Sequence, residues 1–566
     1  MPNARVAGAP APPAATREGR SRIGPRRAGA RPPMTQTLGR PLWTALILIV
    51  LAALEFGLAS GAGRILVTSY EVDTLHYLDG IERVRLGQVP HLDFRTPLGA
   101  LTFEALAVWG ETPARAMALA NLTVALICAP LAAWLAATRM GVLPAVGLGG
   151  FAALLSSALM VDATGLGSSL ALGYNRWGWA ALILVAPIMA LAPRRPGAAA
   201  DWGDALALGL TGALVAFLKV SFVAALAPMW LAWALFGGRP RAALLSLAAA
   251  AAGMAALSAA LGGAEATLAY LADLWDVATS ESRAQPGASL AGVVASPQAA
   301  PLMLCALVAI LALARGGLGR EALAVGLFVL GVALAAWQNW GNELTGLAAL
   351  PFLLLALAPR MAETAKVLGG SGRRAVETIA VVLLVWAAPI AVNAQRSLAL
   401  AYSARPEMAV LAPDVAPDLH WNAPEIGPTV TTPLHPERAA RRIAIAGETL
   451  PACRMGRSYA QLLSEAAAAV RGDPAMAGRR ILALDLTNAL WLLGGGAPLA
   501  GVYIWVYGDS GDALRQAEVL AVPLCPPVER VRDAMIKETE ALGLDLRVIR
   551  RIPGWLFVEN RSARGE

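Results

Sequence analysis

Charged side chains gather in one short segment of this chain, residues 61–97. The segment holds five carboxylates, two histidines and four arginines: Glu71, Asp73, Asp79, Glu82, Asp93, His76, His91, Arg64, Arg83, Arg85 and Arg95. A carboxylate beside a membrane can act as a general base, taking the proton from a hydroxyl as that hydroxyl attacks a substrate. The alternative is a solvated loop in which the same charges form ordinary surface ion pairs.

The spacing within this segment predicts a helix over 71–86 that lies on a membrane surface. Three- and four-residue spacing would place Asp73, His76, Tyr77 and Gly80 on one face of the helix. That face would therefore present a carboxylate, an imidazole and a phenol together.

Some of the same residues are of types that bind metals. His76, Asp79, His91 and Asp93 could hold a divalent ion, but their spacing defines no ligand set. We therefore predict no cofactor, and a divalent metal at these four positions is the alternative.

A lysine interrupts two long apolar runs in the sequence FLKVSF, where it is Lys219. A lysine at the middle of a membrane costs about 2.5–3.5 kcal/mol, so its ammonium should have a partner. The alternative is that the side chain reaches along the helix to the membrane surface.

A third polar group follows in residues 161–176. Asp162, Asn175 and Arg176 lie near Tyr174 and Trp177, and arginine and aromatic rings suit a phosphate or a sugar ring. Arginine next to tryptophan is equally typical of an anchor at the membrane interface.

The composition shows what must position these residues. Of 566 residues, 57% are hydrophobic and only 15% are charged, and the mean hydropathy is +0.57. Soluble domains carry about a quarter charged residues, so the sequence predicts an integral membrane protein. Eleven apolar runs are long enough to be membrane helices: 42–60, 115–138, 142–160, 177–193, 203–219, 220–237, 242–262, 298–315, 321–340, 343–359 and 376–395. A shorter run at 98–112 contains Glu104 and makes the total eleven or twelve.

The charge distribution predicts the orientation. Residues 1–40 contain eight arginines and one glutamate, which equals the net charge of +7 of the whole chain. We therefore expect a disordered basic cytoplasmic tail and no nucleic-acid partner, with Met34 as an alternative start of translation. Lysine and arginine in alternate loops number eleven on one side and four on the other, which places 61–97 and the C-terminal part outside the cytoplasm.

The last part of the chain, 401–566, has more charge and proline and no run that could span a membrane. Alternating apolar residues predict strands at 481–486, 502–507, 518–524, 546–549 and 555–559, and helices at 459–471 and 528–542. The sequence thus predicts an extracytoplasmic α/β domain after a transmembrane domain at 41–400. Cys453 and Cys525 both lie in it and either form a disulfide or remain separate thiols.

The 61–97 segment, with an early aspartate, an aromatic residue shortly after it and then LGQVPHLDFRTPLG, resembles the first outer loop of bacterial GT-C fold membrane glycosyltransferases. This resemblance implies a bundle of eleven to thirteen helices, and often an outer C-terminal domain. It also implies that Asp73 is the catalytic base of an inverting attack on a polyprenyl-phosphate sugar. The chain has Asp73-Thr74 where many members have two adjacent acidic residues, which leaves Glu71 as the alternative base.

The same resemblance implies binding roles for other residues. Asp93 corresponds to the second acidic position of the loop, Arg95 is placed to contact a phosphate, and Lys219 matches a lysine that binds a lipid phosphate. The full set of expected substrate-binding residues is Glu71, His76, Tyr77, Asp93, Arg95, Asp162, Asn175, Arg176 and Lys219.

The sequence thus predicts a multi-pass protein of the bacterial inner membrane that moves a sugar from a polyprenyl-phosphate donor to a glycan, lipid or protein acceptor. The alternative is a transporter or flippase for a lipid-linked sugar or an anion. A transporter would place ionisable residues deep in several helices, whereas Glu104 and Lys219 are the main cases here.

Overall fold

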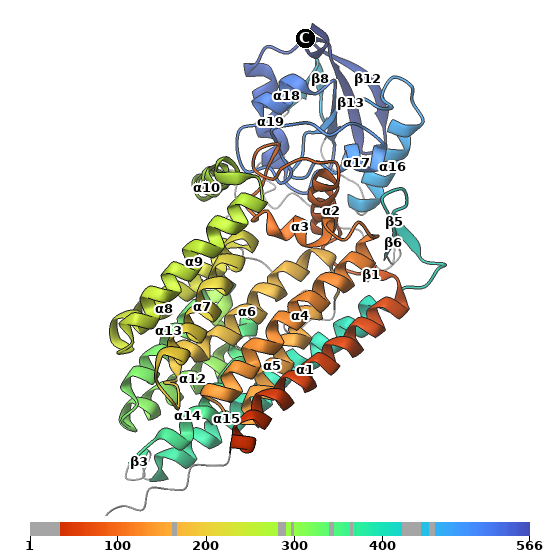
Figure 1. The fold of residues 1–566 in the computed structure, drawn as a ribbon. Coiled ribbons are helices and arrows are strands. Elements are labelled where there is room, and N and C mark those ends of the chain that lie inside the picture. The colour runs from red at the N-terminus through yellow and green to blue at the C-terminus, as the bar shows by residue number, and fades with distance from the viewer. Residues whose placement is uncertain are drawn as a thin grey trace, which may run out of the picture.

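The computed structural model describes residues 34–160, 167–280, 290–295, 299–338, 344–362, 366–367, 370–421, 443–451 and 459–565. Long helices form a bundle, and a smaller region of sheet and short helices caps one end of it, where the C-terminus lies (Figure 1). Of the tail predicted at 1–40, residues 1–33 lie outside the described residues, whereas residues 34–40 are helical and form the start of the first long helix, so the tail prediction was wrong for these seven residues.

Each of the eleven apolar runs forms a helix, as predicted. They are α1 (Met34–Ala62), α4 (Pro113–Thr138), α5 (Val142–Ser157), α6 (Gly173–Ala190), α7 (Ala198–Leu218), α8 (Val220–Phe236), α9 (Pro240–Ala260), α12 (Ala299–Arg315), α13 (Gly319–Gln338), α14 (Leu350–Leu357) and α15 (Gly372–Ala401). Six of them, α1, α4, α7, α9, α13 and α15, are long and apolar enough to cross a membrane. The other five helices are shorter.

The outward faces of the long helices carry large apolar side chains. Leu54 and Leu58 of α1, Leu244 of α9 and Val385 of α15 are all exposed. Patches of this kind are rare on soluble monomers and favour contact with lipid. Buried side chains such as Trp179 and Phe222 fill the bundle between the helices.

The first loop, residues 61–97, folds into β1 (Ile65–Val67), α2 (Glu71–Arg85) and β2 (Phe94–Arg95), and is followed by α3 (Leu101–Ala107). The predicted helix is confirmed as α2, but most of its residues are buried, so it does not lie on a surface. It is enclosed between the bundle and the C-terminal region (Figure 1). The seven residues of α3 span only about 10 Å and cannot cross a membrane.

The C-terminal region is built on a four-stranded sheet with the order β12-β13-β11-β9. In it β9 (Ile481–Ala483) runs parallel to β11 (Val519–Pro523), and β13 (Trp555–Asn560) pairs antiparallel with β11 and with β12 (Leu546–Ile552). The helices of this region are α16 (Tyr459–Arg471), α17 (Leu490–Gly494), α18 (Gly511–Gln516) and α19 (Glu529–Ala541). The predicted strands and helices are confirmed at four of the five strand positions and at both helix positions.

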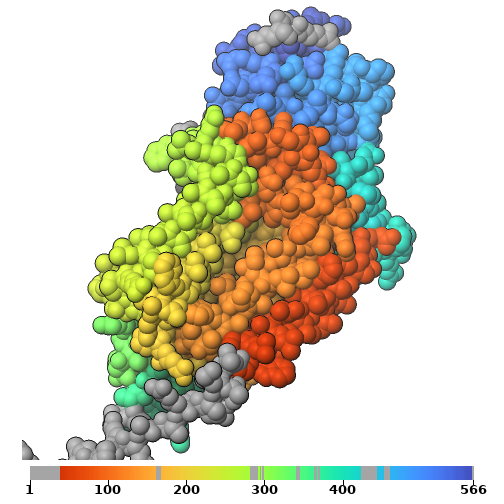
Figure 2. Space-filling model, in the orientation of Figure 1, coloured from red at the N-terminus to blue at the C-terminus, as the bar shows by residue number. Residues whose placement is uncertain are grey.

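The strand expected at 502–507 is the exception. Only β10 (Val502–Tyr503) forms there, and it pairs with β2 of the first loop instead of with the sheet. A second parallel pair joins β1 to β6 (Ala416–Trp421), which also pairs with β5 (Ala409–Ala412). The first loop and the C-terminal region therefore share one hydrophobic core, and the predicted boundary at 401 does not separate two independent units. Figure 2 shows the orange surface of the first loop lying against the blue C-terminal region.

The segment after α9, expected to be a loop, contains α10 (Gly263–Thr279) and α11 (Leu290–Ala295). The remaining short elements are the 3-10 turns η1 (Leu170–Leu172), η2 (Leu344–Ala349), η3 (Ala358–Arg360) and η4 (Arg561–Gly565), and the strand pairs β3 (Lys366–Val367) with β4 (Gly370–Ser371) and β7 (Ala444–Ile445) with β8 (Glu448–Thr449). Cys525 is disulfide-bonded, whereas Cys453 lies outside the described residues.

Candidate functional site

A cavity of about 370 Å³ lies where the bundle meets the C-terminal region. Its wall combines α2, the start of α6, the junction of α7 and α8, α10 and the segment after β10. The residues that carry polar groups into this wall are Tyr70, Asp73, His76, Tyr77, Tyr174, Asn175, Lys219, Ser221, Gln338, Trp505 and Tyr507. The cavity thus brings together residues that are up to several hundred positions apart in the sequence.

Helix α2 positions three of the predicted residues, Asp73, His76 and Tyr77, which all line the cavity. The fourth residue of that predicted face, Gly80, packs closely against α3, because a Cβ atom there would lie 2.3 Å from the Phe103 ring. The helix can therefore approach α3 only because residue 80 lacks a side chain. Tyr77 is buried and donates a hydrogen bond to the Thr102 carbonyl at 2.7 Å. This bond connects α2 to α3 and so stabilises the cavity wall.

Asp73 is the carboxylate of the cavity. Burial raises the pKa of Asp73 to about 7, and the nearby Glu71 carboxylate also raises it, against the opposing effects of the Asp73 backbone N–H and of Lys219. A carboxyl with this pKa exchanges protons near neutral pH, which is the property required of a general base. Glu71 itself does not line the cavity and acts on it through the charge that it places beside Asp73.

His76 lies beside Asp73 on the cavity wall and is held by the C-terminal region. Its Nδ1 lies 2.9 Å from the Ile504 carbonyl, and its ring meets Trp505 edge-on at 4.8 Å. A carbonyl only accepts hydrogen bonds, so Nδ1 carries the proton and Nε2 has the lone pair. Burial lowers the pKa of His76 to about 4, so the ring is neutral at pH 7.

Lys219 is the cation of the cavity. It is the single extended residue between α7 and α8, with φ −163° and ψ 109°, and it is buried. Its Nζ donates to Asn175 Oδ1 at 2.7 Å and lies 5.1 Å from the centre of the Tyr174 ring. The buried ammonium thus points at a polar partner inside the cavity, which is the arrangement predicted for it and differs from reaching to a surface.

The three residues predicted from segment 161–176 have different locations. Asn175 lines the cavity, where it accepts from Lys219. Arg176 is fully buried, donates to the Met160 carbonyl at 2.7 Å and is not among the residues that line the cavity. Asp162 lies outside the described residues.

Two residues of the loop motif do not reach the cavity. Asp93 accepts from the Val89 backbone N–H at 2.7 Å and so closes a turn. Arg95 donates to Asp273 at 2.8 Å, is paired with Asp276 as well, and lies over the Tyr503 ring. Since its guanidinium is bonded to two carboxylates of α10, Arg95 fixes the loop to that helix in this structure.

The residues considered for a metal also have separate partners. Asp79 accepts from Arg83 and Trp491, His91 Nδ1 bonds to Asp273, and His76 and Asp93 make the contacts given above. Their side chains do not converge on one point in the described part of the chain.

The sequence did not reveal that α10, Ser221 and Tyr507 contribute to the wall. Helix α10 places Leu274 and Val277 against the cavity and buries Asp273 on the same side, while Leu268, Leu271 and Trp275 are exposed. The signal was present as an apolar helical pattern within the segment expected to be a loop. Ser221 and Tyr507 carried no sequence signal, because only the fold brings them to the cavity.

Taken together, the cavity offers a carboxyl that titrates near neutral pH, a buried ammonium and several aromatic rings. This combination can accept a proton from a hydroxyl and hold an anion close to it. No protein-family model matches the sequence, and no curated protein matches it.

Proposed function

We propose that this protein is a membrane glycosyltransferase of the GT-C type, which transfers a sugar from a polyprenyl-phosphate donor to an acceptor hydroxyl. The observation that carries the proposal is that Asp73 and Lys219, a carboxyl and an ammonium from distant segments, line the same cavity. The aromatic rings of Tyr174, Trp505 and Tyr507 in the same wall suit the faces of a sugar ring.

In the proposed reaction Asp73 takes the proton from the acceptor hydroxyl. The hydroxyl oxygen forms a bond to the anomeric carbon, and the bond from that carbon to the phosphate oxygen breaks on the opposite face. The polyprenyl phosphate leaves with the electron pair, and Lys219 stabilises its charge. The anomeric centre is therefore inverted, and the proton remains on Asp73 until it is released.

We propose a bacterial plasma-membrane location with the cavity outside the cytoplasm, and the arrangement of basic residues supports this orientation. At one end of α4 the Ala114 backbone N–H donates to Asp418 of the C-terminal region. At the other end Arg139 bonds to Asp204, and Arg360 and Arg194 donate to nearby carbonyls. Basic residues thus cluster at the end away from the cavity, which by the positive-inside rule is the cytoplasmic end.

The test is sugar transfer by the purified protein from a labelled polyprenyl-phosphate sugar. Asp73→Asn keeps the shape of the side chain but removes the base, so we expect turnover to fall by about 10²–10⁴-fold with an unchanged melting temperature. Glu71→Gln is the matched control, because Glu71 lies outside the cavity, and it should keep most of the turnover.

Full activity of Asp73→Asn would remove Asp73 from this role. Loss of turnover in Glu71→Gln with normal turnover in Asp73→Asn would make Glu71 the base. Uptake of the lipid-linked sugar into vesicles without transfer would instead support a transporter or flippase.

A further inference from the structure

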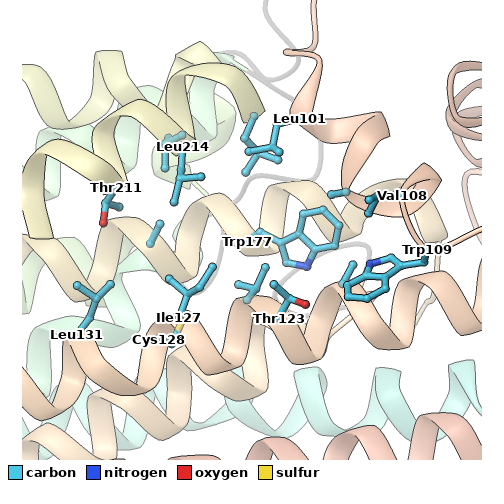
Figure 3. A pocket seen from close by; sticks show the side chains of 16 residues that line it. Leu101, Val108, Trp109, Thr123, Ile127, Cys128, Leu131, Trp177, Thr211 and Leu214 are labelled. Atoms are coloured by element: carbon cyan, nitrogen blue, oxygen red, sulfur yellow. The ribbon is translucent and has the colours of Figure 1, made fainter. Parts of the chain in front are cut away.

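Two apolar grooves flank the C-terminal half of α7, and they differ in their relation to the cavity. The first, of about 260 Å³, lies between α3, α4, α6 and α7. Leu101, Trp109, Thr123, Trp177 and Leu214 are among the side chains that line it (Figure 3). The second, of about 370 Å³, lies on the other side of α7, between α7, α8, α9 and α10.

A backbone seam separates the first groove from the cavity. The Gly99 N–H and the Thr102 hydroxyl both donate to the Leu218 carbonyl, at 3.1 and 2.7 Å. The approach is so close that a Cβ atom on Gly99 would lie 1.9 Å from the Phe217 carbonyl oxygen. The protein backbone therefore fills the space between this groove and Lys219.

The second groove adjoins the cavity. Val220 and Leu274 line both of them, and Val220 is the neighbour of Lys219. The groove lining on α7 extends from Phe217 to Leu208, a rise of nine steps along the helix, or about 14 Å at 1.5 Å per residue. This is close to the depth of one leaflet, half of a hydrocarbon core of about 30 Å. Exposed Leu247 and Leu271 border the groove, so it is also open to lipid from the side.

The cavity contains an unused hydrogen-bonding group next to the mouth of this groove. Ser221 lies in the first turn of α8, is 6% exposed and lines the cavity, and its hydroxyl has no partner among the described residues. A buried hydroxyl without a partner is unfavourable, and the first turn of a helix favours an anion. Rotation about the Cα–Cβ bond would turn Oγ toward an anion held by Lys219.

We propose that the phosphate of an isoprenoid lipid binds at the start of α8, between Lys219 and Ser221, and that its hydrocarbon chain lies in the α7–α10 groove. This assignment rests on the proposed function for the identity of the lipid. The assignment excludes the groove of Figure 3 as the binding site of the hydrocarbon chain. It places the hydrocarbon chain in the leaflet nearest the C-terminal region.

The test is equilibrium binding to the full-length protein in lipid nanodiscs with three probes: a long-chain polyprenyl phosphate, a short water-soluble isoprenyl phosphate and inorganic phosphate. Gly212→Phe fills the α7–α10 groove, where a Cβ atom meets no atom within 4 Å. We expect this substitution to lower the affinity for the long-chain probe at least tenfold and the affinity for the short probe less than twofold. Each buried methylene contributes about fourfold in affinity, so displacing two of them is enough. Leu271→Trp narrows the same groove from an exposed position and covers the case that Gly212→Phe fails to fold.

Thr123→Phe, which fills the other groove, is the matched control, and it should change the affinity for each of the three probes by less than twofold. Ser221→Ala should lower the affinities for the long and short probes equally, by about fivefold to tenfold, because only the contact with the phosphate is lost.

Unchanged long-chain binding in both groove variants, or a loss confined to Thr123→Phe, would overturn the assignment of the chain. Equal affinity for inorganic phosphate and the long-chain probe would show that the site takes free phosphate. Unchanged affinity in Ser221→Ala would show that Ser221 does not contact the phosphate. Binding is measured without turnover, so a lack of sugar transfer by the unaltered protein would contradict the proposed function and leave this binding assignment standing.

Discussion

The two ends of α2 use the same residue types in opposite ways. At its start, Asp73 faces a cavity, and the only other charged side chain among the described residues of that wall is Lys219. One and a half turns further on, Asp79 is fully buried and accepts from Arg83 Nε at 2.7 Å and from Trp491 Nε1 at 2.9 Å. Arg83 in turn donates to the Leu499 carbonyl and lies over the Trp491 ring.

The difference shows why a count of charges in this loop did not identify the site. Asp79, Arg83, Asp93 and Arg95 form contacts to the C-terminal region, to α10 or within the loop, and these contacts hold the loop in place. Asp73 and Lys219 instead keep groups directed into a cavity that a ligand could enter. The loop was expected to carry either chemistry or ordinary ion pairs, and the structure shows paired charges at one end and a cavity at the other.

The largest expected effect on stability is at the paired end. Arg83→Met leaves the buried Asp79 without its cation, which should destabilise the protein by about 3–5 kcal/mol. Thermal unfolding in detergent measures this change. In the double variant Asp79→Asn, Arg83→Met, neither charge remains and an acceptor for Trp491 is kept, so most of the loss should be recovered. If the double variant is as unstable as the single one, the ion pair is not what holds this end.

A smaller effect is expected where the loop meets α10. Asp273 accepts from Arg95, from His91 and from the Thr96 backbone N–H. Asp273→Asn turns an amide donor toward these donors, so we expect a loss of about 1.5–3 kcal/mol in unfolding and a higher KM, because α10 forms one wall of the cavity. Asp276→Asn at the more exposed rim is the control and should cost less than about 1 kcal/mol. Equal effects of the two substitutions would contradict the central role of Asp273.

If the protein transfers sugars as proposed, the pH dependence of the reaction should report on Asp73. Asp73 must be ionised to accept a proton, and its pKa is raised to about 7. We therefore expect kcat/KM to rise about tenfold per pH unit below pH 7 and to level off above it. His76, with a pKa lowered to about 4, stays neutral across this range. An acid limb near pH 4 would show that the base is a carboxylate in a more polar setting than Asp73.

The smallest effect concerns the Glu71 charge beside Asp73, the proposed base. The Glu71 carboxylate raises the pKa of Asp73, so Glu71→Gln should lower it and move the acid limb to lower pH by less than about one unit. Glu82→Gln, at the far end of α2 beside Arg85, is the control and should leave the limb in place. A shift in the opposite direction would show that Glu71 does not act on Asp73 through its charge.

Local pattern was sufficient for much of the fold. Apolar runs and helical spacing predicted the eleven bundle helices, α2, α16 and α19, because each depends on residues close together in the chain. The spacing on α2 also predicted that Asp73, His76 and Tyr77 would share one face, and the FLKVSF sequence predicted a lysine with a polar partner. Helix α10 was missed because the segment was interpreted as a loop from its position between apolar runs.

The sequence by itself thus determined the helices and which polar residues were unusual, and only the tertiary structure decided which of them meet. Ile65 pairs with Leu419, and Phe94 pairs with Val502, in parallel strands that no local pattern specifies. These pairings bring Trp505 and Tyr507 over α2 and take Asp93 and Arg95 away from the cavity. Such contacts depend on closing loops of several hundred residues, and their stability comes from a shared core that forms only when both segments are in place.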